Sequence, residues 1–101
     1  MQFRITAYDG KEPEVFERRM SVRPQHLESI TKVKEKGKVI CAGGITDEEG
    51  KLIGSFLIMD FDTRELLDEY LASEPYVINN VWQDILIEPC KTVIINDEMI
   101  I

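Results

Sequence analysis

Metal-binding and disulfide-forming residues are scarce in this sequence of 101 residues, which contains one histidine and two cysteines. Because the single imidazole, His26, cannot complete the usual histidine-based zinc spacing, the sequence predicts no metal site. Cys41 and Cys90 lie far apart and belong to no Cys-x-x-Cys motif or Cys/His cluster. Such cysteines are typical of a reducing compartment, and we expect both to be small buried hydrophobic residues.

Motifs that hold common cofactors or present a serine nucleophile are absent as well. The sequence has no Gly-x-Gly-x-x-Gly, no Gly-x-x-x-x-Gly-Lys-Ser/Thr and no Gly-x-Ser-x-Gly. These absences argue against a dinucleotide site, a P-loop and a serine-hydrolase site. We therefore expect no cofactor.

Long hydrophobic runs and an excess of basic residues are also missing. No apolar run approaches the ~20 residues that span a bilayer, and residues 1–20 carry charges where a signal peptide has its apolar core. Acidic residues outnumber basic ones by 19 to 12, which leaves a net charge of −7. This charge is unfavourable for binding nucleic acid or an anionic membrane surface. We expect a cytoplasmic protein that binds neither.

What remains is the composition of a globular protein, with 44% hydrophobic and 31% charged residues. A chain of this length has room for one hydrophobic core, so we expect a single domain over residues 1–101. Hydrophobic periodicity and turn residues predict its elements. They are a strand over 2–8, a helical turn over 13–20, a helix over 24–36 that starts at Pro24 and stops at Gly37, a strand over 38–42, a loop over 43–50, a strand over 52–61, a helix that has Asp62 as its N-cap and ends before Pro75, and a strand over 83–92.

This order of elements is typical of the ferredoxin-like fold, an α+β fold in which two helices cover one face of a four-stranded antiparallel sheet. The expected strand order is 4-1-3-2, with right-handed crossovers. Cys41 and Cys90 then lie on opposite edge strands, too far apart for a disulfide bond. Pro89 in the last strand agrees with an edge position or a bulge.

Two features predict a homodimer. The third strand is apolar on both faces, with Leu57 and Met59 on one and Phe56 and Ile58 on the other, whereas two helices cover only one face of a sheet. The C-terminal tail over 92–101 is also strongly apolar. A second copy is the simplest cover for the open face, and the tail would add a strand or an arm to it. The alternative is that the tail folds back on its own domain.

The expected topology brings the start of the first helix close to the end of the second. His26 and Glu74 each continue the buried stripe of their helix, and a carboxylate on an apolar face requires a partner. Paired with Glu74, His26 would be held in one tautomer and suited to act as a general base and then as an acid. The alternative is an ion pair that only ties the two helix ends together.

Three arginines, Arg18, Arg19 and Arg23, precede His26 closely. Arginine binds carboxylates and phosphates with a planar fork, and the N-terminus of the helix expected to start at Pro24 favours an anion. We therefore expect a small anionic ligand. The alternative is that the arginines balance neighbouring glutamates, above all in the case of Arg18.

Further residues are candidates for the walls of the ligand site. The hydroxyl of Ser55 is suited to hydrogen bonding, and Gly54 would let a ligand approach the backbone. Tyr76 and Trp82 are candidates for the pocket walls, although such aromatic residues are more often plain core. The acidic loop over 47–49 is interpreted as a solvated turn.

Several of these residues belong to segments that resemble a known family. Residues 19–27 are RMSVRPQHL, 42–44 are AGG, 54–55 are GS and 74–76 are EPY. Together they resemble the YCII-related (YciI-like) family of small bacterial proteins over nearly the whole chain. The resemblance implies a ferredoxin-like fold related to dimeric α/β-barrel proteins such as muconolactone isomerase. It also implies a histidine/aspartate active site, in which His26 takes the place of the histidine and Glu74 stands where the family has the aspartate of an Asp-Pro-Tyr motif.

The chemistry that the resemblance implies is that of a lyase or isomerase, since the characterised reaction in the family is the dehydrochlorination of a chlorinated hydroxyquinol. Our leading hypothesis is a cofactor-independent enzyme that acts on a small anionic or phenolic compound, with His26 and Glu74 as the catalytic residues. The predicted substrate-binding residues are Arg19, Arg23, Ser55 and Tyr76. One alternative is a non-catalytic ligand-binding or structural dimer, and another is an interaction module that uses the apolar tail.

Overall fold

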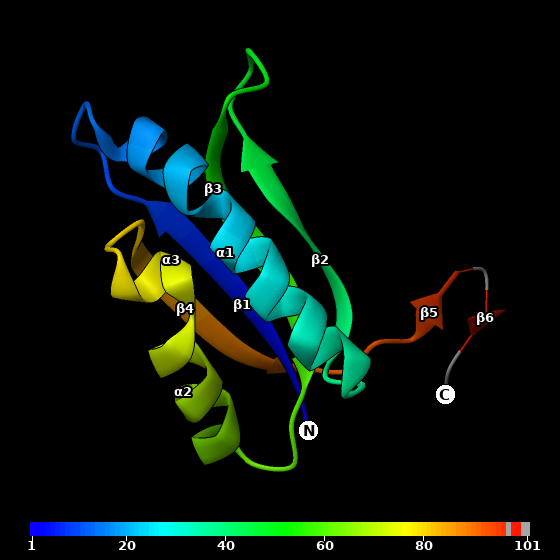
Figure 1. The fold of residues 1–101 in the computed structure, drawn as a ribbon. Coiled ribbons are helices and arrows are strands. Elements are labelled where there is room, and N and C mark those ends of the chain that lie inside the picture. The colour runs from blue at the N-terminus through cyan, green and yellow to red at the C-terminus, as the bar shows by residue number, and fades with distance from the viewer. Residues whose placement is uncertain (97, 100–101) are drawn as a thin grey trace.

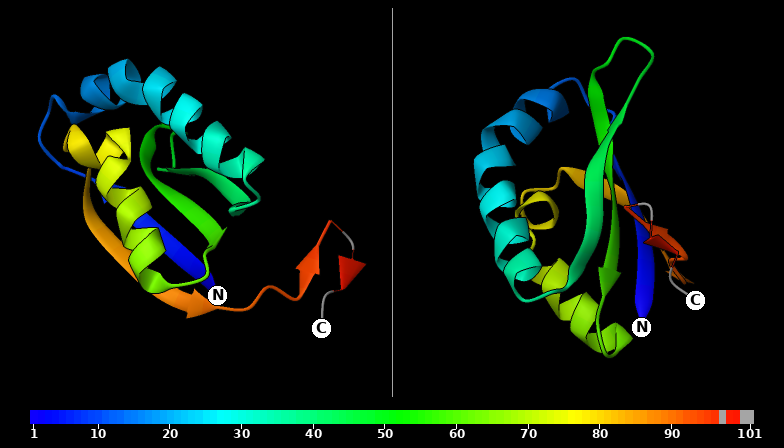
Figure 2. Two further views of the ribbon diagram at one scale, coloured as in Figure 1. Left: turned by 60° about the horizontal axis from the view of Figure 1, so that its bottom comes forward. Right: turned by 90° about the vertical axis from the view of Figure 1, so that its right-hand side faces the viewer.

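The computed structural model describes residues 1–96 and 98–99. Its elements in chain order are β1 (Gln2–Asp9), α1 (Val15–Glu35), β2 (Val39–Thr46), β3 (Leu52–Asp60), α2 (Arg64–Ser73), α3 (Pro75–Ile78), β4 (Trp82–Cys90), β5 (Ile94–Ile95) and β6 (Glu98–Met99) (Figure 1). The main sheet is antiparallel, with strand order β2-β3-β1-β4. Helices α1 and α2 cover one of its faces (Figure 2). The predicted ferredoxin-like fold and its strand order are therefore confirmed.

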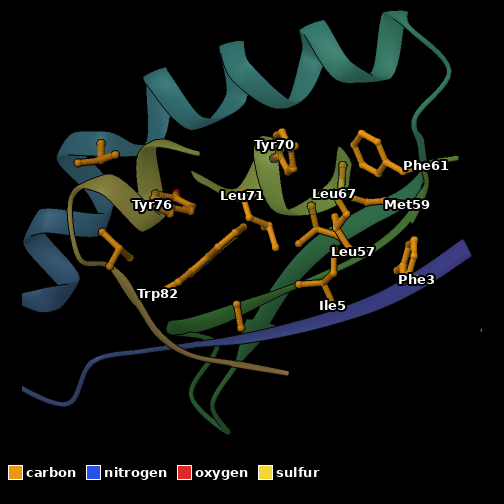
Figure 3. Close-up of a cluster of buried hydrophobic side chains, with 13 residues drawn as sticks. Phe3, Ile5, Leu57, Met59, Phe61, Leu67, Tyr70, Leu71, Tyr76 and Trp82 are labelled. Carbon is orange, nitrogen blue, oxygen red and sulfur yellow. The ribbon is translucent and has the colours of Figure 1, made fainter. Parts of the chain in front are cut away.

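The hydrophobic core lies between the helices and the sheet (Figure 3). Alternation along β1 turns Phe3, Ile5 and Ala7 toward the helices, where all three are buried. Leu67 and Tyr70 of α2 belong to the same buried cluster. Burying a large apolar side chain contributes roughly 1.5–3 kcal/mol, and a slip of one residue would turn the whole set toward solvent. The alternating pattern therefore sets the register of β1.

The first helix is continuous, and the prediction of a separate turn followed by a helix starting at Pro24 was wrong. Helix α1 contains Pro24 in its interior. An interior proline removes one backbone hydrogen bond and costs ~3 kcal/mol or more. Here Pro24 is exposed, whereas Arg19 and Val22 are buried and Ile30 packs against the core. Packing of one face along the whole of α1 therefore outweighs the preference of proline for the start of a helix. Neither α1 nor any other helix within the described residues is long and apolar enough to cross a membrane.

Strand β2 is longer than predicted, because it continues through Gly43 and Gly44 instead of ending at residue 42. Gly44 is paired with Ser55 of β3, and Gly43 with Phe56. A Cβ atom at Gly43 would lie 2.5 Å from Cζ of the Phe56 ring. The two glycines are therefore strand residues over which large side chains of β3 pack, and the loop begins after Thr46.

Helix α2 begins one residue later than expected. Its N-cap is Thr63, whose hydroxyl accepts a hydrogen bond from the Leu66 N–H at 3.2 Å, so the prediction of Asp62 as the cap was wrong. Glu74 ends α2 in an extended conformation, as expected for a residue before proline. The same residue caps the short helix α3, which the sequence analysis did not predict.

The expected edge positions are confirmed, because β2 and β4 lie at opposite edges of the sheet and β4 contains Pro89. Cys41 and Cys90 are free and lie on these two strands. The prediction that both cysteines are buried was wrong, since Cys41 is exposed and Cys90 is partly exposed. Edge strands have fewer neighbours to cover their side chains.

The face of the sheet opposite the helices carries exposed apolar residues. Tyr8, Phe56 and Leu86 are 44%, 41% and 54% exposed, although they lie on three adjacent strands. The chain then leaves β4, where the Thr92 N–H donates to Oε1 of Gln2 at 2.7 Å. Strands β5 and β6 form a small separate hairpin that projects from the domain (Figure 2). The described tail therefore does not fold back on its own core, and residues 97, 100 and 101 of the predicted apolar tail lie outside the described residues.

Candidate functional site

The structure brings His26 and Glu74 together. Nδ1 of His26, near the middle of α1, lies 2.5 Å from Oε1 of Glu74, at the junction of α2 and α3. The Glu74 side chain is fully buried, and that of His26 is 12% exposed. The carboxylate is therefore held below the imidazole and away from solvent. The contact predicted from helix spacing is present, while its catalytic role stays a prediction.

Two further donors hold the Glu74 carboxylate. Oε1 also accepts a hydrogen bond from the Tyr76 N–H at 3.3 Å, and Oε2 accepts one from the Tyr70 hydroxyl. Burial is the main cause that raises the pKa of Tyr70 above its ordinary value, and the adjacent Glu74 carboxylate raises it further. The phenol therefore keeps its proton and acts as a donor. Tyr70 lies four residues before Glu74, which places both on one helix face, and this spacing is the signal in the sequence that could have identified it as a partner of Glu74.

Aromatic rings pack around His26. Its imidazole is stacked on the ring of Tyr76, with centroids 4.1 Å apart, and meets the indole of Trp82 edge-on at 5.7 Å. The Arg19 guanidinium lies 4.8 Å from the centroid of Tyr76. Burial raises the pKa of the Tyr76 phenol, although Arg19 and Arg23 act in the opposite direction. Tyr76 is thus both a wall of the site and a platform that orients His26.

Arg19 is part of the frame of the site, because it is only 3% exposed. Its Nη2 donates to the Gly54 carbonyl at 2.8 Å and to the Ser55 hydroxyl at 2.7 Å. The Trp82 indole N–H also donates to that hydroxyl, at 3.1 Å. The Ser55 hydroxyl oxygen therefore accepts hydrogen bonds from two residues, Arg19 and Trp82, and its own proton is available to another group.

A buried carboxylate beside Arg19 was missed in the sequence analysis. Oδ2 of Asp9 lies 3.6 Å from Nε of Arg19, and the Asp9 side chain is 4% exposed. Burial raises the pKa of Asp9, while the nearby positive charges of Arg19 and Arg18 lower it by less. Asp9 continues the alternation of Phe3, Ile5 and Ala7 onto the buried face of β1, and that alternation was the available signal.

The remaining arginines differ in their surroundings. Arg18 forms an ion pair with Glu12, so for this residue the interpretation as a charge-balancing partner is confirmed. Arg23 is exposed and lies one turn before His26 on α1. The predicted anion site at a helix N-terminus was wrong in this position, because α1 begins at Val15 and Pro24 is interior.

A hollow of about 320 Å³ lies between α1 and the strands β2 and β3. Its polar lining consists of Arg19, Arg23, His26, Ser55 and Tyr76. These are the predicted site residues except Glu74, which lies behind His26. A neighbouring hollow of about 670 Å³ shares Leu52 with the first and reaches Asp9 and Phe16. Within residues 1–96 and 98–99, no group of three or more His, Cys, Asp or Glu side chains is arranged to hold a metal ion.

Comparison with known proteins identifies the family of this chain. The YCII-related domain matches residues 1–91. The chain belongs to the YCII-related domain family. The resemblance noted from the sequence motifs is therefore confirmed, with Glu74 as a departure from the Asp-Pro-Tyr motif that it implies.

Relatives of this YCII-related chain include bacterial proteins of similar length. An uncharacterized protein from Haemophilus influenzae is 31% identical over 87 residues, and the match covers 80% of this chain and 89% of the relative. Protein YciI from Escherichia coli is 27% identical over 92 residues, and the match covers 85% of this chain and 94% of YciI. The tail with β5 and β6 lies beyond the part that the family match covers.

Solved structures that share the fold include two enzymes by their descriptions. The 5-chloro-2-hydroxyhydroquinone dehydrochlorinase from Burkholderia phenoliruptrix, in complex with 2,5-dihydroxybenzoquinone, has a TM-score of 0.78 at 21% identity, over 90% of this chain and 94% of the enzyme. An antibiotic biosynthesis monooxygenase has a TM-score of 0.52 at 22% identity, over 90% of this chain and 98% of that chain. At these identities the similarity shows the ferredoxin-like fold alone.

Proposed function

We propose that this YCII-related protein is a cofactor-independent enzyme that moves protons on a small anionic or phenolic compound, as a lyase or isomerase. The observation that carries the proposal is the buried Glu74 carboxylate held 2.5 Å from Nδ1 of His26, beside a hollow that the imidazole lines. Because Nδ1 is engaged by Glu74, Nε2 is the nitrogen left to exchange a proton with a substrate. The carboxylate would stabilise the imidazolium that forms.

The other lining residues suit a small ring compound with a negative charge or acidic hydroxyls. Arg23 is exposed at the hollow and offers a cation, and Ser55 has a hydroxyl proton to donate. Arg19 and Tyr76 form a wall of the hollow, where Arg19 holds the Ser55 hydroxyl and Tyr76 stacks on His26. A volume of about 320 Å³ is at the lower end of the range typical of ligand sites. The fold neighbour described as a dehydrochlorinase in complex with a dihydroxybenzoquinone supports the same class of ligand.

We also propose a homodimer in the cytoplasm. The support is the open sheet face with exposed Tyr8, Phe56 and Leu86, together with an apolar hairpin tail that projects from the domain. Packing two such faces against each other would remove these side chains from water.

The test uses chlorinated hydroxyquinols and dihydroxybenzoates as substrates, with chloride release and ultraviolet absorbance as readouts. His26→Gln should lower turnover by about 10²–10⁴-fold, which is the usual contribution of a general acid or base. Arg23→Gln should weaken binding of the ligand, whereas Arg64→Gln removes an exposed, ion-paired arginine of α2 and should change neither. Added imidazole should restore part of the turnover of a His26→Ala variant.

The alternative function is distinguished by the same variants. If the compounds bind to the native protein and Arg23→Gln weakens binding, while no product forms and His26→Gln binds equally well, the protein is a non-catalytic ligand-binding dimer. That outcome would contradict the proposed enzyme.

A further inference from the structure

The surroundings of Glu74 set this carboxylate apart from the other acidic residues. Its side chain is fully buried, yet each oxygen has a partner, with His26 and the Tyr76 N–H at Oε1 and the Tyr70 hydroxyl at Oε2. Tyr70 is itself a core residue that is 7% exposed. The hydrogen bond from Tyr70 is thus shielded from water, where charge-assisted hydrogen bonds contribute most.

The contact between Tyr70 and Glu74 depends on the length of the glutamate. The two residues are four apart, and Glu74 ends α2 in an extended conformation because Pro75 follows it. An aspartate at this position would be shorter by one carbon–carbon bond, about 1.5 Å. It would therefore not span both Tyr70 and His26 from the same backbone position. The glutamate that departs from the Asp-Pro-Tyr motif is what brings Tyr70 to the site.

The proton between His26 and Glu74 has two positions. It lies either on the imidazole, opposite a charged carboxylate, or on the carboxyl group, opposite a neutral imidazole. Burial by itself favours the neutral pair, because it penalises both charges. A hydroxyl that donates to the carboxylate favours the charged form.

We propose that Tyr70 is a positioning residue of the site, which holds Glu74 as a carboxylate and so keeps the shared proton on His26. This inference rests on the proposed function, because it concerns the same histidine and glutamate. Tyr70 contacts Glu74 and does not line the hollow, so it acts through Glu74. In this arrangement the histidine can return a proton to the substrate after taking it up.

The first test measures where the proton is, without any substrate. The ¹⁵N shifts of the His26 imidazole and the ¹³C shift of the Glu74 carboxyl carbon are compared in native protein and Tyr70→Phe, at a pH where the native pair holds one proton. Removing a hydrogen bond to a charged group should move the equilibrium toward neutral imidazole and protonated Glu74 by roughly tenfold. Unchanged shifts in a folded Tyr70→Phe variant would overturn the proposal.

Two controls separate this role from a merely structural one. Tyr8→Phe makes the same change on the open sheet face, where Tyr8 is 44% exposed, and should leave the signals of His26 in place. In a Glu74→Asp background the carboxylate no longer reaches Tyr70, so Tyr70→Phe should have no further effect on His26. An equal effect in that background would show that Tyr70 acts by another route.

A second measurement applies if Tyr70→Phe does not fold. The chain has three tyrosines, so fluorotyrosine labelling of the native protein resolves each of them by ¹⁹F NMR. Glu74→Asp should shift the resonance of Tyr70 and leave that of Tyr8, and an unmoved Tyr70 resonance contradicts the proposal. If His26 responds to Glu74→Gln while Tyr70 shows no coupling, only this inference fails. If His26 does not respond to Glu74→Gln, the pair and the proposed function fail with it.

Discussion

The structure predicts how much stability the protein loses when the buried pair of Arg19 and Asp9 is broken. Arg19→Met removes the charge and keeps most of the volume, and it leaves the Asp9 carboxylate buried without its cation, 3.6 Å away. The Gly54 carbonyl and the Ser55 hydroxyl each lose a donor as well. Breaking a buried ion pair costs about 3–5 kcal/mol, and the long separation here favours the lower end, about 3 kcal/mol. The free energy of unfolding of such domains is roughly 5–15 kcal/mol, so the variant should still fold.

The loss of stability should depend on pH. Burial already raises the pKa of Asp9, and removal of Arg19 takes away the main opposing influence, so the pKa rises further in the variant. A carboxyl group whose pKa is higher in the folded state than in the unfolded state, where it is ~3.9, destabilises the folded state at high pH. This destabilisation grows as the pH rises from the unfolded pKa to the folded pKa. The deficit of Arg19→Met should therefore be smaller in acid than at neutral pH.

The assay is urea unfolding, followed by the fluorescence of the single tryptophan, Trp82, which is 3% exposed. Asp9→Asn and the double variant complete a double-mutant cycle with Arg19→Met. The double variant should be no less stable than Arg19→Met alone, with a coupling free energy of about 1–3 kcal/mol. Additive losses that are the same in acid and at neutral pH would refute the reasoning.

Three further predictions concern the helix, the sheet and the dimer. Pro24→Ala restores a backbone donor inside α1 and should raise the free energy of unfolding, measured in urea, by up to about 3 kcal/mol. A less stable variant would show that the proline stabilises the folded state by more than the lost backbone hydrogen bond costs. Gly54→Ala places a Cβ atom 2.5 Å from the Ala7 carbonyl oxygen and should lower the melting temperature by the equivalent of about 1–3 kcal/mol, so an unchanged melting temperature contradicts this close packing. Phe56→Glu should convert the proposed dimer to a monomer, as measured by light scattering. Leu66→Glu, which changes a residue of α2 with the same exposure of 41%, should leave the dimer intact. A native protein that is monomeric in the same measurement would contradict the proposed dimer.

Much of the fold was predictable because it depends on patterns within single elements. Alternation along β1, the apolar run of β3 and the turn residues around them were sufficient for the order of elements, and topological rules then determined the strand order. Errors arose where a neighbouring element changed the local preference. Gly43 and Gly44 form a turn by their own propensity, but pairing with β3 makes them part of a strand. Pro24 starts a helix by its own propensity, but packing of the long face of α1 places it in the interior.

The candidate site was predictable to a similar degree. The spacing of His26 and Glu74 along their helices indicated that both face the core, and the structure brings them into contact. The contact between Asp9 and Arg19 could not be predicted, because the two residues come from different elements and meet only when β1 lies beneath α1. The spacing of Tyr70 and Glu74 places both on one helix face, but their hydrogen bond depends on the extended conformation of Glu74 before Pro75.

Sequence alone therefore determined the fold, the family and the contact between His26 and Glu74 on which the proposed function rests, because periodicity and motif spacing are properties of the chain itself. Tertiary structure alone decided which arginine is buried in the frame and which is free to meet a ligand, with Arg19 at 3% exposure and Arg23 exposed at the hollow. The physical reason is that burial, desolvation and hydrogen-bond partners depend on which elements are packed together. Arg19 and Arg23 lie four residues apart on α1 and carry the same charge, but the fold gives them different surroundings.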